Sequence, residues 1–147
     1  MSSDKDPAEK DTYSGHCYCG AIHYSVSKSA QPHKALYCHC ESCRRAHSAP
    51  LYHVVYVPKK DFNITCGHSS VNEFCKPGAA VTRAFCNICG SRLYNTLARD
   101  ENWWGFFPAT LEEVLQHDLP PQFRAQGHNL PDEAVLDTHM LHVSSSI

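Results

Sequence analysis

The distribution of cysteine constrains this chain more than any other feature of its sequence. Seven of the nine cysteines fall into three short clusters, and Cys66 and Cys75 stand apart. The clusters are Cys17-Tyr18-Cys19-Gly20, Cys38-His39-Cys40-Glu41-Ser42-Cys43 and Cys86-Asn87-Ile88-Cys89-Gly90. Both side chains of a C-x-C pair on an extended chain point to one face. After a C-x-x-C turn, glycine can take the positive φ that the turn requires. Either arrangement lets two sulfurs bind one ion.

Zinc favours four tetrahedral ligands in structural sites, and three protein ligands plus an exchangeable one in catalytic sites. Seven cysteines therefore divide naturally into four and three. We predict two zinc ions per chain, one closed and structural, the other open to substrate. The predicted ligands are Cys17, Cys19, Cys86 and Cys89 for the structural zinc, and Cys38, Cys40 and Cys43 for the catalytic zinc.

Two other uses of the cysteines are less favoured. A zinc ribbon that pairs Cys40 and Cys43 with Cys86 and Cys89 needs a gap of about 15–20 residues, whereas 42 residues separate Cys43 from Cys86. A disulfide framework is disfavoured because the first 12 residues lack the apolar core of a secretory signal. We therefore expect a cytoplasmic protein.

Composition narrows the class of protein further. A chain of 147 residues with 42% hydrophobic and 19% charged residues fits one globular domain. We expect a disordered leader over residues 1–12, a single zinc-binding β domain over residues 13–143 and a frayed tail over residues 144–147. A net charge of −2 with scattered Lys and Arg gives no basic patch for nucleic acid, and no apolar stretch approaches the roughly 20 residues of a membrane span. The oligomeric state stays open.

Short alternating and β-branched segments separated by turns predict a mainly β fold of antiparallel sheets with one or two short helices. The expected strands cover residues 22–27, 51–57, 62–66, 71–74, 81–85, 92–95, 104–107 and 139–143. A capping box at Thr110-Leu111-Glu112-Glu113 predicts a short helix that ends before Pro120. The proline-containing segment from Leu119 to Asp137 is expected to be a long surface loop that can form a wall of the pocket.

The clusters and their flanking residues resemble the family of glutathione-dependent formaldehyde-activating enzymes, which also includes a vertebrate centromere protein. The matching motifs are Gly15-x-Cys17-x-Cys19-Gly20, Cys38-His39-Cys40-x-x-Cys43-Arg44 and Phe85-Cys86-x-x-Cys89-Gly90-Ser91. The resemblance covers residues 13–110 approximately, and order, spacing and flanking residues agree together. The C-terminal third departs from the family, since His128 and Val135-Leu136-Asp137 match it only loosely.

The resemblance implies a β-tent fold, in which sheets are clamped by the four-cysteine zinc. It also implies a carbon–sulfur lyase that combines glutathione and formaldehyde into S-hydroxymethylglutathione, or acts on a related thiol adduct. At the three-cysteine site, zinc would bind a substrate thiol and lower its pKa, so that the sulfur becomes a nucleophile or a leaving group. Arg44 and Arg45 can pair with carboxylates of a peptide thiol or offset the charge at the metal, and His39 should point away from the metal.

Less specific interpretations stand beside these. Both zinc sites can be purely structural, the second completed by His39, His47 or water, and the protein is then a non-enzymatic, zinc-stabilised protein-binding module. Arg44 and Arg45 can equally be solvated surface charges without a role at the site. Cys66 and Cys75 are expected to be small hydrophobes in or near the core. Four aromatic residues should close the core, with one ring at the pocket mouth as the alternative: Trp103, Trp104, Phe106 and Phe107.

Overall fold

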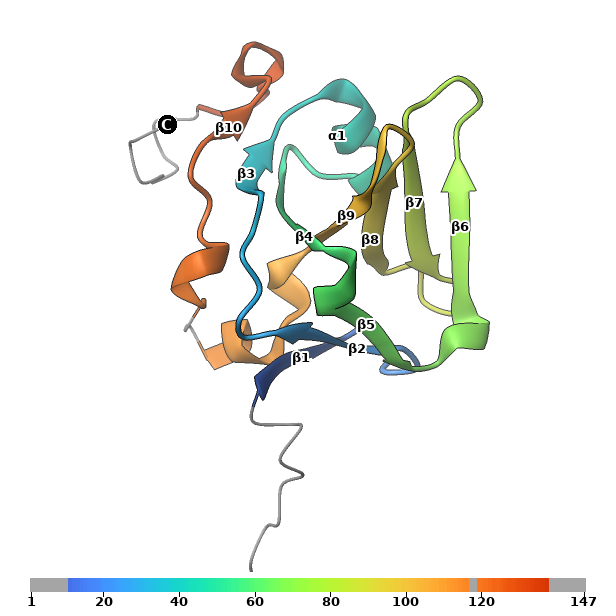
Figure 1. The fold of residues 1–147 in the computed structure, drawn as a ribbon. Coiled ribbons are helices and arrows are strands. Elements are labelled where there is room, and N and C mark those ends of the chain that lie inside the picture. The colour runs from blue at the N-terminus through green and yellow to red at the C-terminus, as the bar shows by residue number, and fades with distance from the viewer. Residues whose placement is uncertain (1–10, 117–118, 138–147) are drawn as a thin grey trace, which may run out of the picture.

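The computed structural model describes residues 11–116 and 119–137, and these residues fold mainly into strands. Figure 1 shows the arrangement, with the α-helix of residues 41–47 at one end of the sheets. The strands are β1 (Thr12–His16), β2 (His23–Ser27), β3 (Lys34–Cys38), β4 (Tyr52–Pro58), β5 (Phe62–Cys66), β6 (Val71–Cys75), β7 (Val81–Cys86), β8 (Arg92–Leu97), β9 (Asp100–Phe106) and β10 (His128–Asn129). The helix is α1 (Glu41–His47), and the short 3-10 turns are η2 (Lys59–Asp61), η3 (His68–Ser70), η4 (Pro108–Thr110), η5 (Glu112–Gln116), η6 (Pro121–Phe123) and η7 (Pro131–Glu133).

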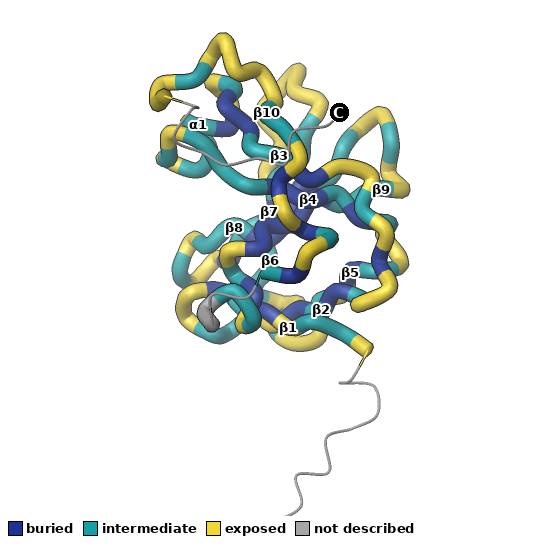
Figure 2. Tube along the Cα trace, turned by 90° about the vertical axis from the view of Figure 1, so that its left-hand side faces the viewer, coloured by how far each residue is buried: buried dark blue, intermediate teal, exposed yellow. Residues whose placement is uncertain are grey.

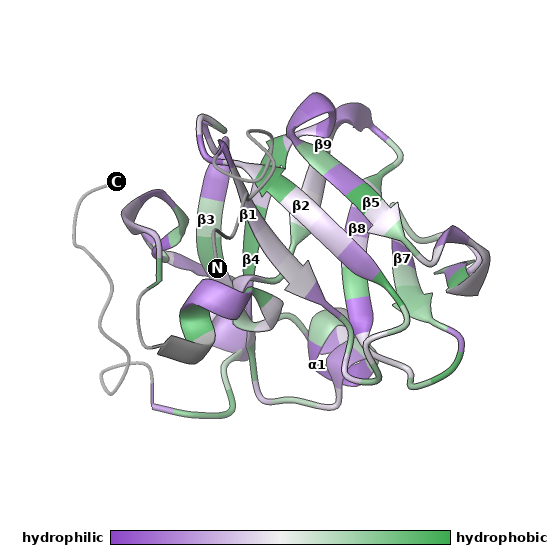
Figure 3. Ribbon diagram, turned by 90° about the horizontal axis from the view of Figure 1, so that it is seen from below, coloured by the Kyte–Doolittle hydropathy of each residue, from purple (hydrophilic) through white to green (hydrophobic). Residues whose placement is uncertain are grey.

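Two sheets make up the fold. The smaller has the strand order β1-β2-β5, and the larger has the order β10-β3-β4-β9-β8-β7-β6. All strand pairs are antiparallel except β10 with β3. Figure 3 shows the smaller sheet lying across the strands of the larger one. The predicted mainly β class is confirmed, and the core lies where the two sheets face each other, with the outer loops exposed (Figure 2).

Aromatic rings fill the space between the sheets. Tyr24 of β2 stacks on Phe62 of β5 at 5.1 Å between ring centroids, and Phe106 of β9 meets Phe123 edge-on at 5.1 Å. Such pairs add about 0.5–1.5 kcal/mol beyond the burial of their apolar area. Of the predicted core aromatics, Phe106 and Phe107 are buried and Trp104 packs against the core. The core is therefore formed largely by residues that the sequence marked as strand positions.

Seven of the predicted strands are confirmed within one or a few residues, as β2 and β4 to β9. The prediction missed β1, β3 and β10, and the expected strand at residues 139–143 lies outside the described residues. Residues 1–10 of the predicted leader and residues 144–147 of the predicted tail also lie outside them, whereas Thr12 already begins β1. A two-residue parallel strand such as β10 has no sequence signature, because it forms only where β3 offers a free edge.

The predicted helix at Thr110 is wrong. Two 3-10 turns, η4 and η5, occupy this region, and Thr110 does not cap a helix. Its Oγ1 donates to the Phe107 carbonyl over 3.0 Å and lies 2.7 Å from the hydroxyl of buried Tyr24. A tertiary partner thus takes the hydroxyl that the capping box would have used. The segment from Leu119 to Asp137 is not a plain loop either, since it carries η6, β10 and η7.

Gly15 on β1 illustrates how closely the smaller sheet packs. A Cβ at this position would overlap the ring of Tyr24, which is fully buried and has no room to move. We expect Gly15→Ala to lower the free energy of unfolding by about 1–3 kcal/mol, the usual effect of overpacking. Ser14→Ala, at the exposed neighbouring position, should change it by less than about 0.5 kcal/mol. Urea denaturation of the zinc-loaded proteins measures both values, and equal stability of the two variants would contradict the expectation.

Candidate metal centre

Four cysteines from distant parts of the chain meet beside the core. The Sγ atoms of Cys17, Cys19, Cys86 and Cys89 all lie within 4.8 Å of one another. Cys17 and Cys19 lie in the turn after β1, whereas Cys86 ends β7 and Cys89 lies in the turn before β8. The cluster therefore connects the smaller sheet to the larger one.

The local backbone explains how each turn presents two sulfurs. Gly20 and Gly90 have φ values of +77° and +80°, as expected for glycine after a metal-binding turn. Their amides donate to the carbonyls of Cys17 and Cys86 over 3.0 and 2.8 Å. The two turns also contact each other, because the amide of Tyr18 donates to Ser91 Oγ over 2.8 Å. The expectation of an extended chain at Cys17 and Cys19 is wrong, since a turn brings their sulfurs together.

The other three motif cysteines form a second cluster. The Sγ atoms of Cys38, Cys40 and Cys43 also lie within 4.8 Å of one another. Cys38 ends β3, Cys40 is the N-cap of α1, and Cys43 is buried in the first turn of that helix. The Cys40 sulfur accepts a hydrogen bond from the Cys43 amide over 3.3 Å. The helix that the sequence analysis missed thus begins on a cysteine, which is not among the usual N-cap residues.

Both clusters have the donor chemistry and spacing that zinc requires. Sulfurs at about 2.3 Å from a tetrahedral zinc lie about 3.8 Å from one another. The Sγ separations are 3.6 Å for Cys17 and Cys19, 3.8 Å for Cys19 and Cys86, and 3.5 Å for Cys38 and Cys43. All nine cysteines are free of disulfides. The two clusters can therefore hold metal ions, divided four and three as the sequence analysis expected.

Among the described residues, no histidine, aspartate or glutamate joins either cluster. His39 lies between two cluster cysteines but is fully buried and points elsewhere, with its Nε2 2.8 Å from Nδ1 of His128. The ring of His47 stacks on Tyr52 at 4.2 Å, and burial lowers the pKa of His47 to about 4. The three-cysteine cluster thus lacks a fourth protein donor in this part of the chain.

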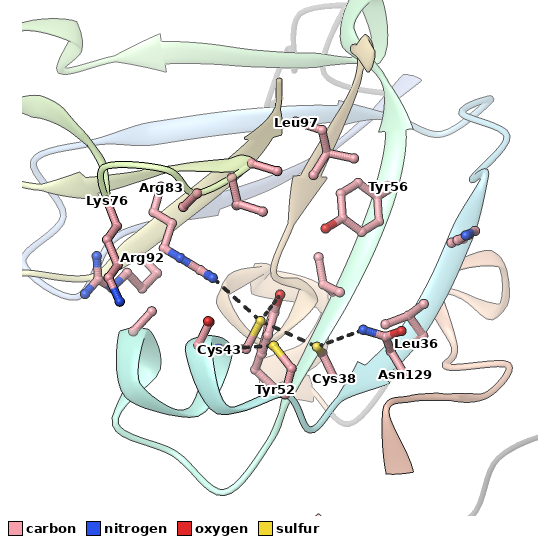
Figure 4. Close-up of a pocket in the computed structure, with 18 of the residues that line it drawn as sticks. Leu36, Cys38, Cys43, Tyr52, Tyr56, Lys76, Arg83, Arg92, Leu97 and Asn129 are labelled. Carbon is pink, nitrogen blue, oxygen red and sulfur yellow. Dashed lines mark hydrogen bonds between the residues drawn. The ribbon is translucent and has the colours of Figure 1, made fainter. Parts of the chain in front are cut away.

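The three-cysteine cluster lies at one end of a pocket with a volume of about 850 Å³. The larger sheet curves around this pocket, so that β3 and β4 form one side and β6, β7 and β8 the other (Figure 4). Its apolar lining includes Leu36, Val54, Tyr56, Val81, Leu97 and Trp103. Trp103, predicted as a core residue or as a ring at the pocket mouth, lines the pocket and stacks on His33 at 4.8 Å.

Cations outnumber anions along the pocket wall. The basic residues are Lys34, Arg45, Lys76, Arg83 and Arg92, and the acidic ones are Glu41 and Asp100. Arg83 reaches furthest toward the cysteines, with Nη2 3.7 Å from the Sγ of Cys43, while its buried Nη1 has no hydrogen-bond partner (Figure 4). A guanidinium nitrogen without a partner beside a cavity can bind an anionic group of a ligand.

Hydrogen bonds stabilise the thiolate of Cys43. The neighbouring Cys38 thiol has the largest effect, and Cys40, Tyr52 and Arg83 add to it, so that the pKa of Cys43 falls to about 5. Desolvation alone would lower the pKa of Arg83, but its hydrogen bond to Cys43 and the charge of that sulfur raise it. Tyr52 lies 3.3 Å from the same sulfur, and burial raises the pKa of its hydroxyl, which keeps its proton.

The structure places the two arginines that follow Cys43 differently. Arg44 does not line the pocket, because its Nε donates to the carbonyl of His39 over 3.1 Å. Arg45 does line the pocket, but it is exposed and pairs with Glu41 one helical turn away. The missed residues are Arg83 of β7, Tyr52 of β4 and Asn129 of β10. Only Asn129 had a signal, since it lies in the segment expected to form a pocket wall.

The expectation that Cys66 and Cys75 lie in or near the core is wrong. Both are exposed rather than buried in or near the core. Each is the last residue of a strand at the edge of its sheet, β5 and β6 respectively. Neither belongs to a cluster of potential ligands among the described residues.

Comparison with known proteins adds to this geometry. The sequence model of glutathione-dependent formaldehyde-activating enzymes matches residues 12–126, which is most of the chain. The chain belongs to this family. The match includes all seven clustered cysteines and Arg83, and it stops before β10. Among residues 11–116 and 119–137, no helix has the length and apolar character needed to cross a bilayer.

Two similar proteins illustrate the relationship. An uncharacterized lyase of Schizosaccharomyces pombe is 30% identical over 92 residues, and the match spans 61% of this chain and 61% of that protein. A crystal structure of a Rhodobacter sphaeroides protein superposes with a TM-score of 0.61 at 22% identity, covering 79% of this chain and 99% of the other. At that identity the superposition establishes a shared fold.

Proposed function

We propose that this protein is a zinc-dependent carbon–sulfur lyase that forms or cleaves thiol–aldehyde adducts. Glutathione and formaldehyde are the proposed pair, with S-hydroxymethylglutathione as product, or a related thiol in place of glutathione. In the forming direction the thiol sulfur bonds to the aldehyde carbon, the carbon–oxygen π bond breaks, and the thiol proton ends on the new hydroxyl. No oxidant, reductant or further reactant is required.

One observation carries this proposal. Three cysteines converge at the end of a large pocket, and no fourth protein donor among the described residues joins them. A structural zinc site is closed by four protein ligands, whereas a catalytic site keeps one position for substrate or water. The four-cysteine cluster fits the first kind and the three-cysteine cluster fits the second.

The chain's own residues have separable roles in this scheme. Cys38, Cys40 and Cys43 would hold a zinc ion, which when bound supplies a site where a substrate thiol is ionised. Arg83 would orient an anionic group of the thiol substrate and offset negative charge at the sulfurs. The Tyr52 hydroxyl lies within hydrogen-bond distance of the Cys43 sulfur, at 3.3 Å, and would keep that sulfur in place. The apolar walls exclude water and confine the aldehyde beside the sulfur, and such proximity can supply much of the rate.

The remaining parts of the proposal follow from the cysteines. Two zinc ions per chain are proposed as the cofactors, with a small thiol and an aldehyde as partners. Nine free cysteines, three of them exposed, are characteristic of a reducing compartment, which supports a cytoplasmic location.

The decisive experiment measures adduct formation directly. Zinc-loaded protein is incubated with glutathione or another small thiol and formaldehyde, and the approach to equilibrium is followed by exchange NMR, with zinc per chain measured in the same sample. We expect two ions per chain and faster exchange between free and adduct-bound formaldehyde. Protein with two ions that neither binds a thiol nor accelerates exchange would contradict the proposal and favour the protein-binding module.

Arg83 provides a test of how the substrate is recognised. Loss of a charge-assisted hydrogen bond costs about 1.5–3 kcal/mol, so we expect Arg83→Met to raise KM for carboxylate-bearing thiols about 10–100-fold. The effect should be much smaller for an uncharged thiol, because that substrate has no anionic group to lose. Arg44→Met is the matched control, since Arg44 does not line the pocket. Equal effects of Arg83→Met on KM for charged and uncharged thiols would show that Arg83 does not bind an anionic group of the substrate.

A further inference from the structure

A short segment of the chain lies against the three-cysteine cluster without belonging to the region that the family match covers. This segment, residues 127–133, comprises Gly127, β10 and the turn η7, and we refer to it as the strap. The family match ends at residue 126. In Figure 1 the strap runs beside β3, at the same end of the sheet as α1.

The backbone of the strap pairs with the residues that carry the cysteines. β10 is parallel to β3, with His128 opposite Tyr37 and Asn129 opposite Cys38. The amide of Tyr37 donates to the Gly127 carbonyl over 3.0 Å. The amide of His39 donates to the Asn129 carbonyl over 3.1 Å. The strap therefore supplies acceptors on both sides of Cys38.

Side chains of the strap reach three more points of the same loop. Asn129 Nδ2 donates to the Sγ of Cys38 over 3.3 Å, as Figure 4 shows. Nδ1 of His128 lies 2.8 Å from Nε2 of His39, and the two rings are stacked at 5.0 Å. Glu133 Oε2 accepts from the amide of Glu41, the first residue of α1, over 2.7 Å. These contacts span the loop from one end of the cluster to the helix that carries Cys43.

Hydrophobic burial does not explain why the strap lies here. Residues 129–133 are exposed, and His128 is only partly buried. Fixing the backbone of each residue costs conformational entropy, which buried apolar area offsets elsewhere in the fold. In the strap the compensating contacts are polar, and most of them are made with residues 37–41. The position of the strap is therefore set by its polar contacts with residues 37–41 and not by packing against the core.

We propose that His128 and Asn129 are positioning residues of the three-cysteine metal site. Asn129 fixes the sulfur of Cys38 by donating to it, and His128 anchors His39, so that Cys38 and Cys40 on either side keep their sulfurs on the pocket side. The inference rests on the proposed metal-binding role of this cluster. Outer-shell partners of metal ligands commonly change metal affinity by about 10–100-fold.

The experiment titrates metal without any substrate. Apoprotein, prepared under reducing conditions, is titrated with cobalt(II) against a competing chelator, and the sulfur-to-cobalt charge-transfer absorption reports each site. We expect Asn129→Ala to weaken the second, three-cysteine ion about 10–100-fold and to leave the four-cysteine ion unchanged. Gln122→Ala is the control, because it removes a side-chain amide that donates to the Lys28 carbonyl over 2.9 Å, and neither residue belongs to a cysteine cluster.

A second variant separates hydrogen bonding from shape. Asn129→Asp keeps the size of the side chain but replaces the donor with an anionic acceptor, so we expect the second ion to bind at least as weakly as in Asn129→Ala. Affinity within twofold of wild type for both Asn129 variants would overturn the proposal. Equal weakening of both ions would assign Asn129 to general folding and would overturn it too. A wild-type protein that binds only one ion would instead overturn the proposed function, before any variant is made.

Discussion

Replacing Cys40 by serine is expected to remove one zinc ion per chain and to abolish thiol–aldehyde exchange activity. The three-cysteine cluster would keep only Cys38 and Cys43, too few ligands to hold the ion at an open site. The substitution is otherwise mild, because Cys40 caps α1 by accepting from the Cys43 amide, and serine is a favoured N-cap residue. The helix should therefore persist while the metal site is lost.

Metal content by mass spectrometry of the intact protein and exchange activity measure this outcome. Cys75→Ser is the matched control, since Cys75 is exposed and belongs to no cluster of the described residues. This control should retain both ions and full activity. A Cys40→Ser protein with two ions and wild-type activity would show that the catalytic site lies elsewhere.

Replacing Cys86 by serine is expected to eliminate the cooperatively folded state. Cys86 is fully buried within the core cluster and ends β7, and its sulfur lies 3.8 Å from that of Cys19 in the turn after β1. Structural zinc contributes about 10–16 kcal/mol in small zinc domains, which is as large as the whole stability of a typical domain, about 5–15 kcal/mol. Loss of this ion should separate the two sheets.

Thermal unfolding followed by near-ultraviolet circular dichroism measures this prediction. Cys66→Ser is the control, because Cys66 is an exposed strand end outside both clusters. This variant should melt within a few degrees of wild type, whereas Cys86→Ser should lack a cooperative transition at any temperature. A strong chelator should produce the same loss in the wild-type protein. A Cys86→Ser melting curve like that of wild type would mean that the aromatic core alone holds the sheets together.

The cysteine clusters and the strands could be predicted from the sequence, whereas the order of the strands could not. The division of the seven cysteines into four and three followed from their spacing, because a C-x-C or C-x-x-C pair already brings two sulfurs near each other. Only the meeting of two such pairs at one site depends on the fold. The strands followed from alternation of apolar and polar residues, which predicts where half-buried strands lie. Their order in two sheets did not follow, since it depends on contacts between distant segments.

Local rules failed where a tertiary contact replaced a local one. The Thr110 hydroxyl meets Tyr24 instead of capping a helix. The helix α1 begins on a cysteine sulfur, and a distant glutamate accepts from its first amide. Arg44 follows the cysteine motif directly but is held by the His39 carbonyl, whereas Arg83 reaches Cys43 from a strand 40 residues further along the chain.

The sequence by itself determined the mainly β class, the two groups of clustered cysteines and the family, because these depend on residue types at short, regular spacing. Only the tertiary structure decided which cation faces the cysteine sulfurs, that Tyr52 and Asn129 contact them, and that the strap holds their loop. Those side chains come from β4, β7 and β10, and the pairing of strands brings them together although nothing in their local sequence marks them.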